Sequence, residues 1–288
     1  MRLSVLDDGH RRRAKLFMAA TAAMSRVDSP DIVRTLLYRP DFLSRALLDL
    51  TAPAMRGPSY WTAGEREFLA MGTAKLHECP FCAVTHEELV RIAGHGEVDP
   101  ERPASARPEL LAVRAFLDTV SGAAGEPDAS LIADVPLTAV TDALRVNLVW
   151  DIVNRLANAF GFVLREGQLH SGTRSLHRFG YRFPAFLLAG GARTDHGDPV
   201  ENLRHSAIDA EGVTPVKLRT AVFDDDPVGE PWQDYAERVR HAAYRISDEE
   251  VAALRAAGHS EDAIFEVTEA AAAGAALRAY DAGRDAVS

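Results

Sequence analysis

The sequence predicts an all-α fold, and three observations support this prediction. Apolar residues recur at helical spacing in most segments, and alternating runs of β-branched residues are few. Two Ser/Thr-x-x-Glu capping boxes stand where such segments begin. Hydrophobic residues make up 47% of the 288 residues, so the chain can bury a sizeable core in one large domain or two small ones.

Prolines bound the first three expected helices. The first covers about residues 11–26 and is ended by the turn signal Asp28-Ser29-Pro30. The second covers about 30–38. Arg39-Pro40 separates it from a third helix over about 41–50, because proline disfavours α geometry in the residue before it.

Capping signals mark the next two helices. Thr62 and Glu65 form a capping box, so a helix starts there and carries Glu67. Another helix starts near Cys79 and ends before Gly94, since glycine commonly follows the last residue of a helix. These two helices carry the residues on which the functional prediction depends.

The rest of the chain divides into two parts. Helical periodicity covers about 109–120 and about 138–164, the latter as one long helix or a pair, whereas residues 167–199 have only weak periodicity. Gly190-Gly191 and residues 195–199 look like a linker. We therefore expect a first domain over residues 1–189 and a smaller helical module over residues 200–288.

The smaller module is expected to contain helices at about 215–222, 231–244, 247–257 and 260–282. Ser247 and Glu250 form the capping box that opens the third of these, and Gly258 stops it. The last helix is rich in alanine, which has the highest helix propensity.

Charge and hydropathy argue against several classes of protein. The formal net charge is −10 at pH 7, whereas a general nucleic-acid binder presents a basic surface. No apolar run reaches the length of a membrane span, and the first residues lack the order of a signal peptide. We therefore expect a cytoplasmic protein with neither a membrane nor a nucleic acid as partner. There, a lone C-x-x-C pair is more often redox-active or metal-bound than structural.

The only two cysteines stand three residues apart in Cys79-Pro80-Phe81-Cys82, and His86 follows. With Cys79 as the N-cap, Pro80 falls at the first helical position, where its missing N–H is harmless. Cys82 then lies among unpaired backbone N–H groups at the positive end of the helix dipole, which favours a thiolate. Positions 79, 82 and 86 share one inward-facing helical stripe. The two sulfurs can also meet the distance requirement of a disulfide.

Glu67 supplies an acidic partner for His86. A carboxylate on the preceding helix should approach His86 directly or through one water, fix the imidazole tautomer and raise its basicity. His86 could then take the thiol proton, and the thiolate would attack the O–O bond of a hydroperoxide. The other cysteine would resolve the resulting sulfenic acid as a disulfide. The residues therefore predict a two-cysteine peroxidase.

The stretch from Trp61 to His86 resembles the alkylhydroperoxidase D-like (AhpD-like) family of the carboxymuconolactone decarboxylase superfamily. The family pattern is a glutamate, eleven residues and then C-x-x-C-x-x-x-H, and its four positions are matched by Glu67, Cys79, Cys82 and His86. The resemblance covers about residues 30–165 and implies an all-α helical bundle that usually forms oligomers. Residues 244–282 resemble the closing helices of another such module without its cysteines, which implies a degenerate second unit.

The resemblance implies a role for each matched residue. Cys82 would be the peroxidatic sulfur, Cys79 the resolving one, His86 the base and Glu67 the relay that polarises it. It also implies a homo-oligomer and a dithiol reductant such as lipoyl groups on a protein partner. We expect a small hydroperoxide as substrate and no bound cofactor or metal.

Two points in these roles stay open. Phe81 stands where the peroxidase often has a second histidine, and His77 is the candidate to replace it. The order of the sulfurs is also open on the residues alone, because the first cysteine of such a motif is usually the better nucleophile, whereas proximity to the base favours Cys82.

Three alternatives remain. A zinc site could use Cys79, Cys82 and His86 with a fourth ligand from His77 or Glu67, although structural sites usually gather ligands from two separate elements. A decarboxylase or isomerase of the same superfamily would need no cysteine pair. A non-enzymatic thiol sensor would use a disulfide to change helix packing.

Overall fold

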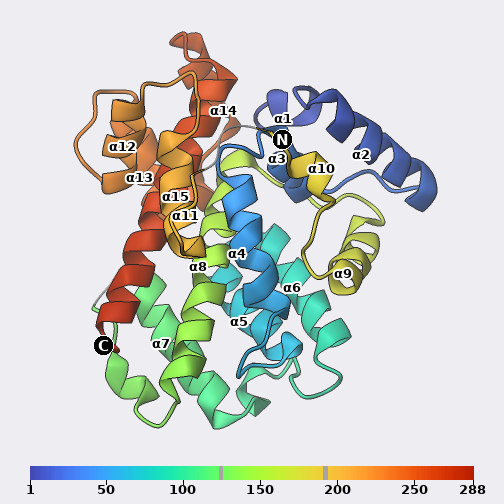
Figure 1. Ribbon diagram of the computed structural model, residues 1–288, viewed down its shortest axis with the longest axis vertical. Coiled ribbons are helices and arrows are strands. Elements are labelled where there is room, and N and C mark those ends of the chain that lie inside the picture. Colours follow the sequence, from blue (N-terminus) through green and yellow to red (C-terminus); the bar gives the residue numbers. More distant parts are fainter. Residues whose placement is uncertain (123–125, 191–193) are drawn as a thin grey trace.

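The computed structural model describes residues 1–122, 126–190 and 194–288, which contain helices and no β-strand (Figure 1), so the predicted all-α fold class is confirmed. The first part of the chain forms α1 (Val5–Asp8), α2 (Arg12–Ser25), α3 (Asp31–Tyr38), α4 (Ser44–Arg56), α5 (Ala63–Leu76), α6 (Pro80–Ala93), α7 (Pro108–Ser121) and α8 (Leu137–Phe160). They are followed along the chain by α9 (Gln168–Phe179), α10 (Ala185–Leu188), α11 (Pro199–Asp209), α12 (Val216–Asp224), α13 (Trp232–Ala242), α14 (Asp248–Ala256) and α15 (Glu261–Asp285). Among the described helices, none combines the length and the apolar character that crossing a bilayer requires.

The antiparallel pair α5 and α6 holds the cysteine motif. The predicted capping box is present, because the Thr62 hydroxyl accepts a hydrogen bond from the Glu65 N–H at 3.3 Å and the Glu65 carboxylate accepts one from the Thr62 N–H at 2.9 Å. A Cβ atom on Gly64 would lie 2.3 Å from the Gly94 Cα, so only glycine lets the start of α5 approach the end of α6 this closely.

Two long helices, α8 and α15, form the centre of the molecule and pack against each other (Figure 1). The segment expected as one long helix or a pair is a single helix, α8, and its buried positions lie on every face, as expected for a core helix. Helix α15 is also buried over most of its length, and α12 and α13 pack on it. One hydrophobic cluster includes residues of both parts of the chain, for example Val149 of α8 and Phe265 of α15. The division into residues 1–189 and 200–288 stays a prediction, and Gly191 of the expected linker lies outside the described residues.

Some of the chain is more helical than predicted. Helix α4, expected to end near residue 50, continues past Pro53 to Arg56, and the complete burial of Met55 offsets part of the roughly 3 kcal/mol that an interior proline costs. The weakly periodic segment contains α9, whose buried positions are few and polar, so it leaves little apolar signal in the sequence. Gly180, with φ of 62°, ends α9 in the left-handed conformation that favours glycine.

Candidate active site

The start of α6 brings the two cysteines together. Cys79 is the N-cap and Pro80 occupies the first helical turn, as predicted. The Cys82 backbone N–H donates to the Cys79 sulfur, with 3.4 Å between nitrogen and sulfur. Both cysteines are free thiols and each is only 2% exposed. The structure therefore describes the reduced state of the pair.

The inward-facing stripe of α6 is also confirmed. Its members are all buried, and they are Cys79, Cys82, His86, Leu89 and Ala93. His86 is one turn from Cys82, a spacing at which Cβ atoms lie about 5–6 Å apart. Within the described residues no hydrogen bond joins the His86 ring to either sulfur.

Glu67 and His86 form a direct buried pair. His86 Nδ1 lies 2.7 Å from Glu67 Oε2, and the side chains are 1% and 0% exposed. Because a carboxylate accepts, Nδ1 carries the proton of this bond, and in the neutral ring the lone pair is then on Nε2. The contact predicted as direct or water-bridged is therefore direct, and it fixes the tautomer in which Nε2 can accept a proton.

Two further side chains complete the surroundings of Glu67. Arg56 Nη2 lies 2.5 Å from Glu67 Oε1, and the Tyr181 hydroxyl lies 2.8 and 3.0 Å from the two carboxylate oxygens. Burial alone would raise the pKa of Glu67, but the hydrogen bond and charge of His86, followed by those of Arg56, lower it overall. Glu67 is therefore a buried anion that accepts hydrogen bonds from three side chains.

A left-handed turn brings Tyr181 to the site. Gly180 and Tyr181 have φ values of 62° and 64°, and Tyr181 follows α9, which packs on α6. Burial, followed by the nearby charge of Glu67, raises the pKa of Tyr181 well above its usual value, so the phenol stays protonated and donates. The Arg56 guanidinium carbon lies 5.0 Å from the Tyr181 ring centroid.

Trp150 of α8 holds the His86 ring from the side. The two ring centroids are 4.0 Å apart and the planes meet at 75°, an edge-to-face contact. The indole N–H of Trp150 donates to the sulfur of Met55 at 3.2 Å. The His86 ring is therefore fixed by a carboxylate on one edge and an indole against it.

The expected stabilisation of a Cys82 thiolate by the helix start is wrong for this reduced state. The N–H of Cys82 is directed to the Cys79 sulfur and not to the Cys82 sulfur. Burial, and then the hydrogen bond to Cys79 and its charge, raise the pKa of Cys82 well above its usual value. Cys82 is therefore a thiol at rest and needs a base to become a nucleophile.

The structure places His77 in a different polar cluster. It follows α5, and its Nε2 accepts from Arg155 at 3.4 Å and lies 3.5 Å from Asp151, both on α8. Burial, and then the charges of Arg155 and Arg114, lower its pKa well below the usual value. Phe81 packs instead on Phe162, with ring centroids 5.4 Å apart. The His77 ring is therefore engaged by side chains of α8, and its service as a second histidine stays a prediction.

Sequence reasoning found Glu67, His86 and both cysteines but missed Arg56 and Tyr181. Arg56 lies beyond the expected end of its helix, and Tyr181 lies in the weakly periodic segment. The signal available for Tyr181 is Gly180 after a last helical turn that contains His177 and Arg178, a pattern that marks a helix end. Nothing local indicates what either side chain contacts.

Comparison with known proteins gives a distant likeness. No family model matches the chain, and no curated protein matches it. Among solved structures, it is similar to the crystal structure of an alkylhydroperoxidase AhpD core, an uncharacterized peroxidase-related protein from Ralstonia eutropha JMP134. The sequence identity is 21%, the TM-score is 0.46, and the match covers 55% of this chain and 88% of the other. A likeness at this level does not bear on activity, and the all-α fold class rests on the helices themselves.

Proposed function

We propose that this chain is a thiol-dependent oxidoreductase that reduces small hydroperoxides through a redox-active Cys79–Cys82 disulfide. The observation that carries the proposal is the buried 2.7 Å contact between Glu67 and His86, on the same stripe of α6 as two free thiols. A base oriented by a third group, one helical turn from a thiol, is the arrangement that activates a sulfur nucleophile. Two cysteines buried only as small hydrophobic residues would not require a buried Glu67–His86 contact beside them.

His86 acts as the base in this proposal. Its Nε2 lone pair accepts the proton of Cys82, directly or through one water, and the imidazolium that forms is stabilised by the anionic Glu67. The requirement for a base follows from the raised pKa of Cys82. Arg56 and Tyr181 act as positioning residues, since they contact Glu67 and not the sulfurs.

The Cys82 thiolate attacks one oxygen of the hydroperoxide, an S–O bond forms, the O–O bond breaks, and the leaving alkoxide takes the proton from His86. The Cys79 sulfur then attacks the sulfenic acid, an S–S bond forms, and water leaves. Two thiols are oxidised while the hydroperoxide is reduced to an alcohol and water. An external dithiol returns the disulfide to two thiols by exchange.

The proposal also includes the setting expected from the sequence. The reductant is a dithiol such as a lipoyl group on a protein partner, the protein acts in the cytoplasm, and it forms a homo-oligomer. Since both cysteines are 2% exposed, the reductant must reach the sulfurs through a movement of the residues that cover them.

Trapping of the sulfenic acid tests the proposal and the order of the sulfurs. We expect Cys79→Ser to accumulate a sulfenic acid after one equivalent of hydroperoxide, seen by mass spectrometry as one adduct of a dione reagent on Cys82. Cys82→Ser should form no adduct at the same peroxide concentration. An adduct on Cys79 in Cys82→Ser, formed at the wild-type rate, would reverse the roles, and no adduct in either variant would contradict the proposal.

A further inference from the structure

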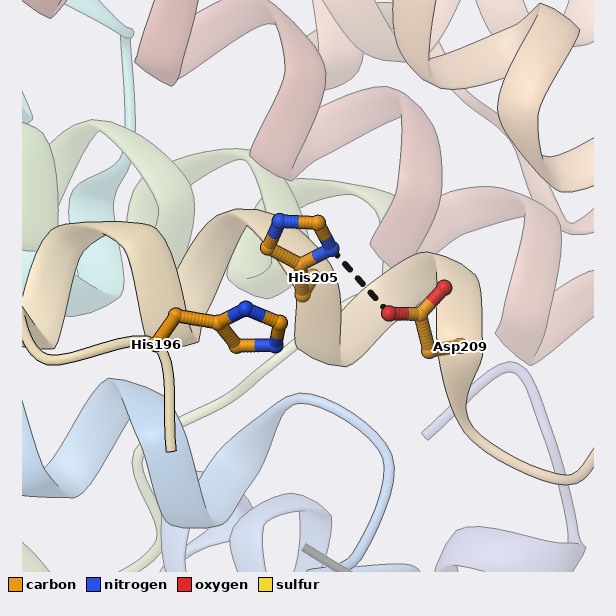
Figure 2. A group of neighbouring side chains, drawn as sticks. All are labelled: His196, His205 and Asp209. Atoms are coloured by element: carbon orange, nitrogen blue, oxygen red, sulfur yellow. Dashed lines mark hydrogen bonds and ion pairs between the residues drawn. The ribbon is translucent and has the colours of Figure 1, made fainter. Parts of the chain in front are cut away.

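A second group of chemically capable side chains lies away from the thiols, at the start and along one side of α11. His196 comes from the loop before this helix, and His205 and Asp209 stand four residues apart on the helix itself (Figure 2). One nitrogen or oxygen atom from each side chain lies within 4.8 Å of the others. Two imidazoles and a carboxylate are a ligand set that zinc commonly takes.

The three side chains already face one another. His205 Nδ1 lies 3.1 Å from Asp209 Oδ2, and the two imidazole rings stack with centroids 3.8 Å apart at an angle of 9°. Figure 2 shows both rings on the same side of the Asp209 carboxylate, with one carboxylate oxygen directed at His205.

Backbone hydrogen bonds hold the loop that supplies His196. The His196 N–H donates to Asn202 Oδ1 at 2.7 Å, so a residue of α11 itself fixes the loop. Asp198 caps α11 by accepting from the N–H groups of Val200 and Glu201 at 2.8 and 3.3 Å. His196 is therefore placed against α11 by contacts that do not involve its ring.

We propose that His196, His205 and Asp209 bind one divalent transition-metal ion of the zinc class. Zinc binds imidazole nitrogen and carboxylate oxygen at about 2.0–2.2 Å in tetrahedral geometry, which puts ligand atoms roughly 3.4 Å apart. The ligand atoms in the structure lie within 4.8 Å of one another, so metal binding requires them to draw closer together. Three protein ligands leave a fourth position for water. Two neutral imidazoles and one carboxylate also leave a dication only partly neutralised, which suits a chain with a net charge of −10.

The fourth position has room for that water. The three ligands line a cavity of about 170 Å³ between α11 and the region around the start of α4, which also includes Asp41 and Arg45. A single water needs only a small part of such a space. Nitrogen ligands select zinc, cobalt or nickel over magnesium and calcium, which prefer oxygen ligands alone.

This site is separate from the cysteine motif. Within the described residues, Cys79, Cys82 and His86 do not form a comparable group of three ligands, and His86 Nδ1 is occupied by Glu67. Substitutions therefore distinguish the two sites. Zinc bound at the cysteine motif would depend on Cys79 and Cys82, whereas zinc bound at the site proposed here would depend on His196 and His205.

Zinc titration of the full-length, metal-stripped protein tests the proposal. We expect calorimetry to give one zinc equivalent for wild type and also for the double variant Cys79→Ser/Cys82→Ser. His196→Gln and His205→Gln should each weaken zinc binding by at least tenfold, since each removes one of three ligands. His177→Gln, which removes an exposed histidine of α9, is the matched control and should bind zinc as wild type does.

Cobalt supplies a second readout of the ligands. Co²⁺ bound at this site should give visible absorption of a four-coordinate nitrogen and oxygen site, without the intense thiolate charge-transfer band. Because His205 is 43% exposed, His205→Gln should fold, and its thermal midpoint without metal should equal that of wild type. Unchanged zinc affinity in both histidine variants, or loss of binding in the double cysteine variant, would overturn the proposal.

Discussion

At the residue scale, the account depends on one buried carboxylate. Glu67 is fully buried and receives hydrogen bonds from His86, Arg56 and Tyr181. Burying a carboxylate without partners costs several kcal/mol, so each of these donors has a structural reason to be there. The same anion orients the His86 ring and stabilises its charged form. The contacts that stabilise the buried Glu67 carboxylate are therefore also the contacts on which the proposed chemistry depends.

Glu67→Gln tests both uses of this side chain. Glutamine keeps the volume but leaves the Arg56 guanidinium without a charged partner, and breaking such a buried pair costs about 3–5 kcal/mol in the free energy of unfolding. The rate of thiol oxidation by hydroperoxide should fall by roughly 10²-fold, the scale of a general-base contribution. Urea unfolding and stopped-flow oxidation measure the two effects.

Tyr181→Phe is the control for that substitution. It removes one donor and leaves the contacts of Glu67 with His86 and Arg56, so it should cost about 1 kcal/mol and leave most of the rate. A Glu67→Gln protein that oxidises at the wild-type rate would show that the pair has only a structural role.

The lowered pKa of Glu67 also predicts how stability depends on pH. The folded state holds the proton less tightly than the unfolded state, whose glutamate has a pKa of about 4.3, so the stabilisation is complete above that value. It is lost as the pH falls through the lower pKa of the folded state. Urea unfolding between pH 7 and pH 3 should show a steeper loss in wild type than in Glu67→Gln. Parallel pH profiles of the two proteins would contradict this assignment.

At the element scale, the close contact between α5 and α6 sets the distance from Glu67 to His86. It depends on Gly64, whose position leaves no space for a Cβ atom beside the backbone of Gly94. The three atoms nearest to that Cβ position are backbone atoms of Gly94 and Ala93, so the clash cannot be relieved by rotating a side chain.

Gly64→Ala should therefore separate the two helices. We expect a loss of about 1–3 kcal/mol in the free energy of unfolding, the range for overpacking, and slower thiol oxidation because Glu67 moves away from His86. Gly172→Ala is the matched control, since its Cβ would meet only Pro30 Cγ at an ordinary 3.6 Å, and an alanine within α9 should stabilise by up to roughly 1 kcal/mol. Equal unfolding midpoints for the two variants would contradict this account.

The elements also show what sequence can and cannot predict. Caps and helix stripes are local, so the Thr62 box and the inward stripe from Cys79 to Ala93 follow from residues near each other in the chain. The contact of Tyr181 with Glu67 joins residues 114 positions apart, and that of Arg56 joins two helices across a turn. Both contacts depend on how α4 and α9 pack around α5 and α6. Such tertiary contacts leave no periodic signal. The raised pKa of Cys82 is a similar case, because burial outweighs the local effect of the helix start.

At the scale of the whole molecule, the second part of the chain shares its core with the first. Helix α15 packs along α8, and a Cβ on Gly274 would lie 2.1 Å from the backbone oxygen of Phe223, so α12 is also in close contact with α15 (Figure 1). The sequence predicted helices there but did not predict this packing. The sequence also did not single out His196 and His205, because the two imidazoles are brought together only by the loop before α11.

A shared core predicts a single cooperative unfolding transition. Trp150 lies in α8 and Trp232 in α13, so variants retaining only one tryptophan report on each part of the chain. We expect their fluorescence transitions in urea to coincide with each other and with loss of helical circular dichroism. Separated midpoints would show that residues 1–189 and 200–288 are independent units.

The most direct measurement of the central claim is a count of free thiols after one equivalent of an organic hydroperoxide. The account predicts that wild type loses two thiols per chain, that a dithiol restores both, and that His86→Ala loses them roughly 10²-fold more slowly. A wild-type protein that keeps both thiols, or that loses them as fast without the His86 imidazole, would contradict it.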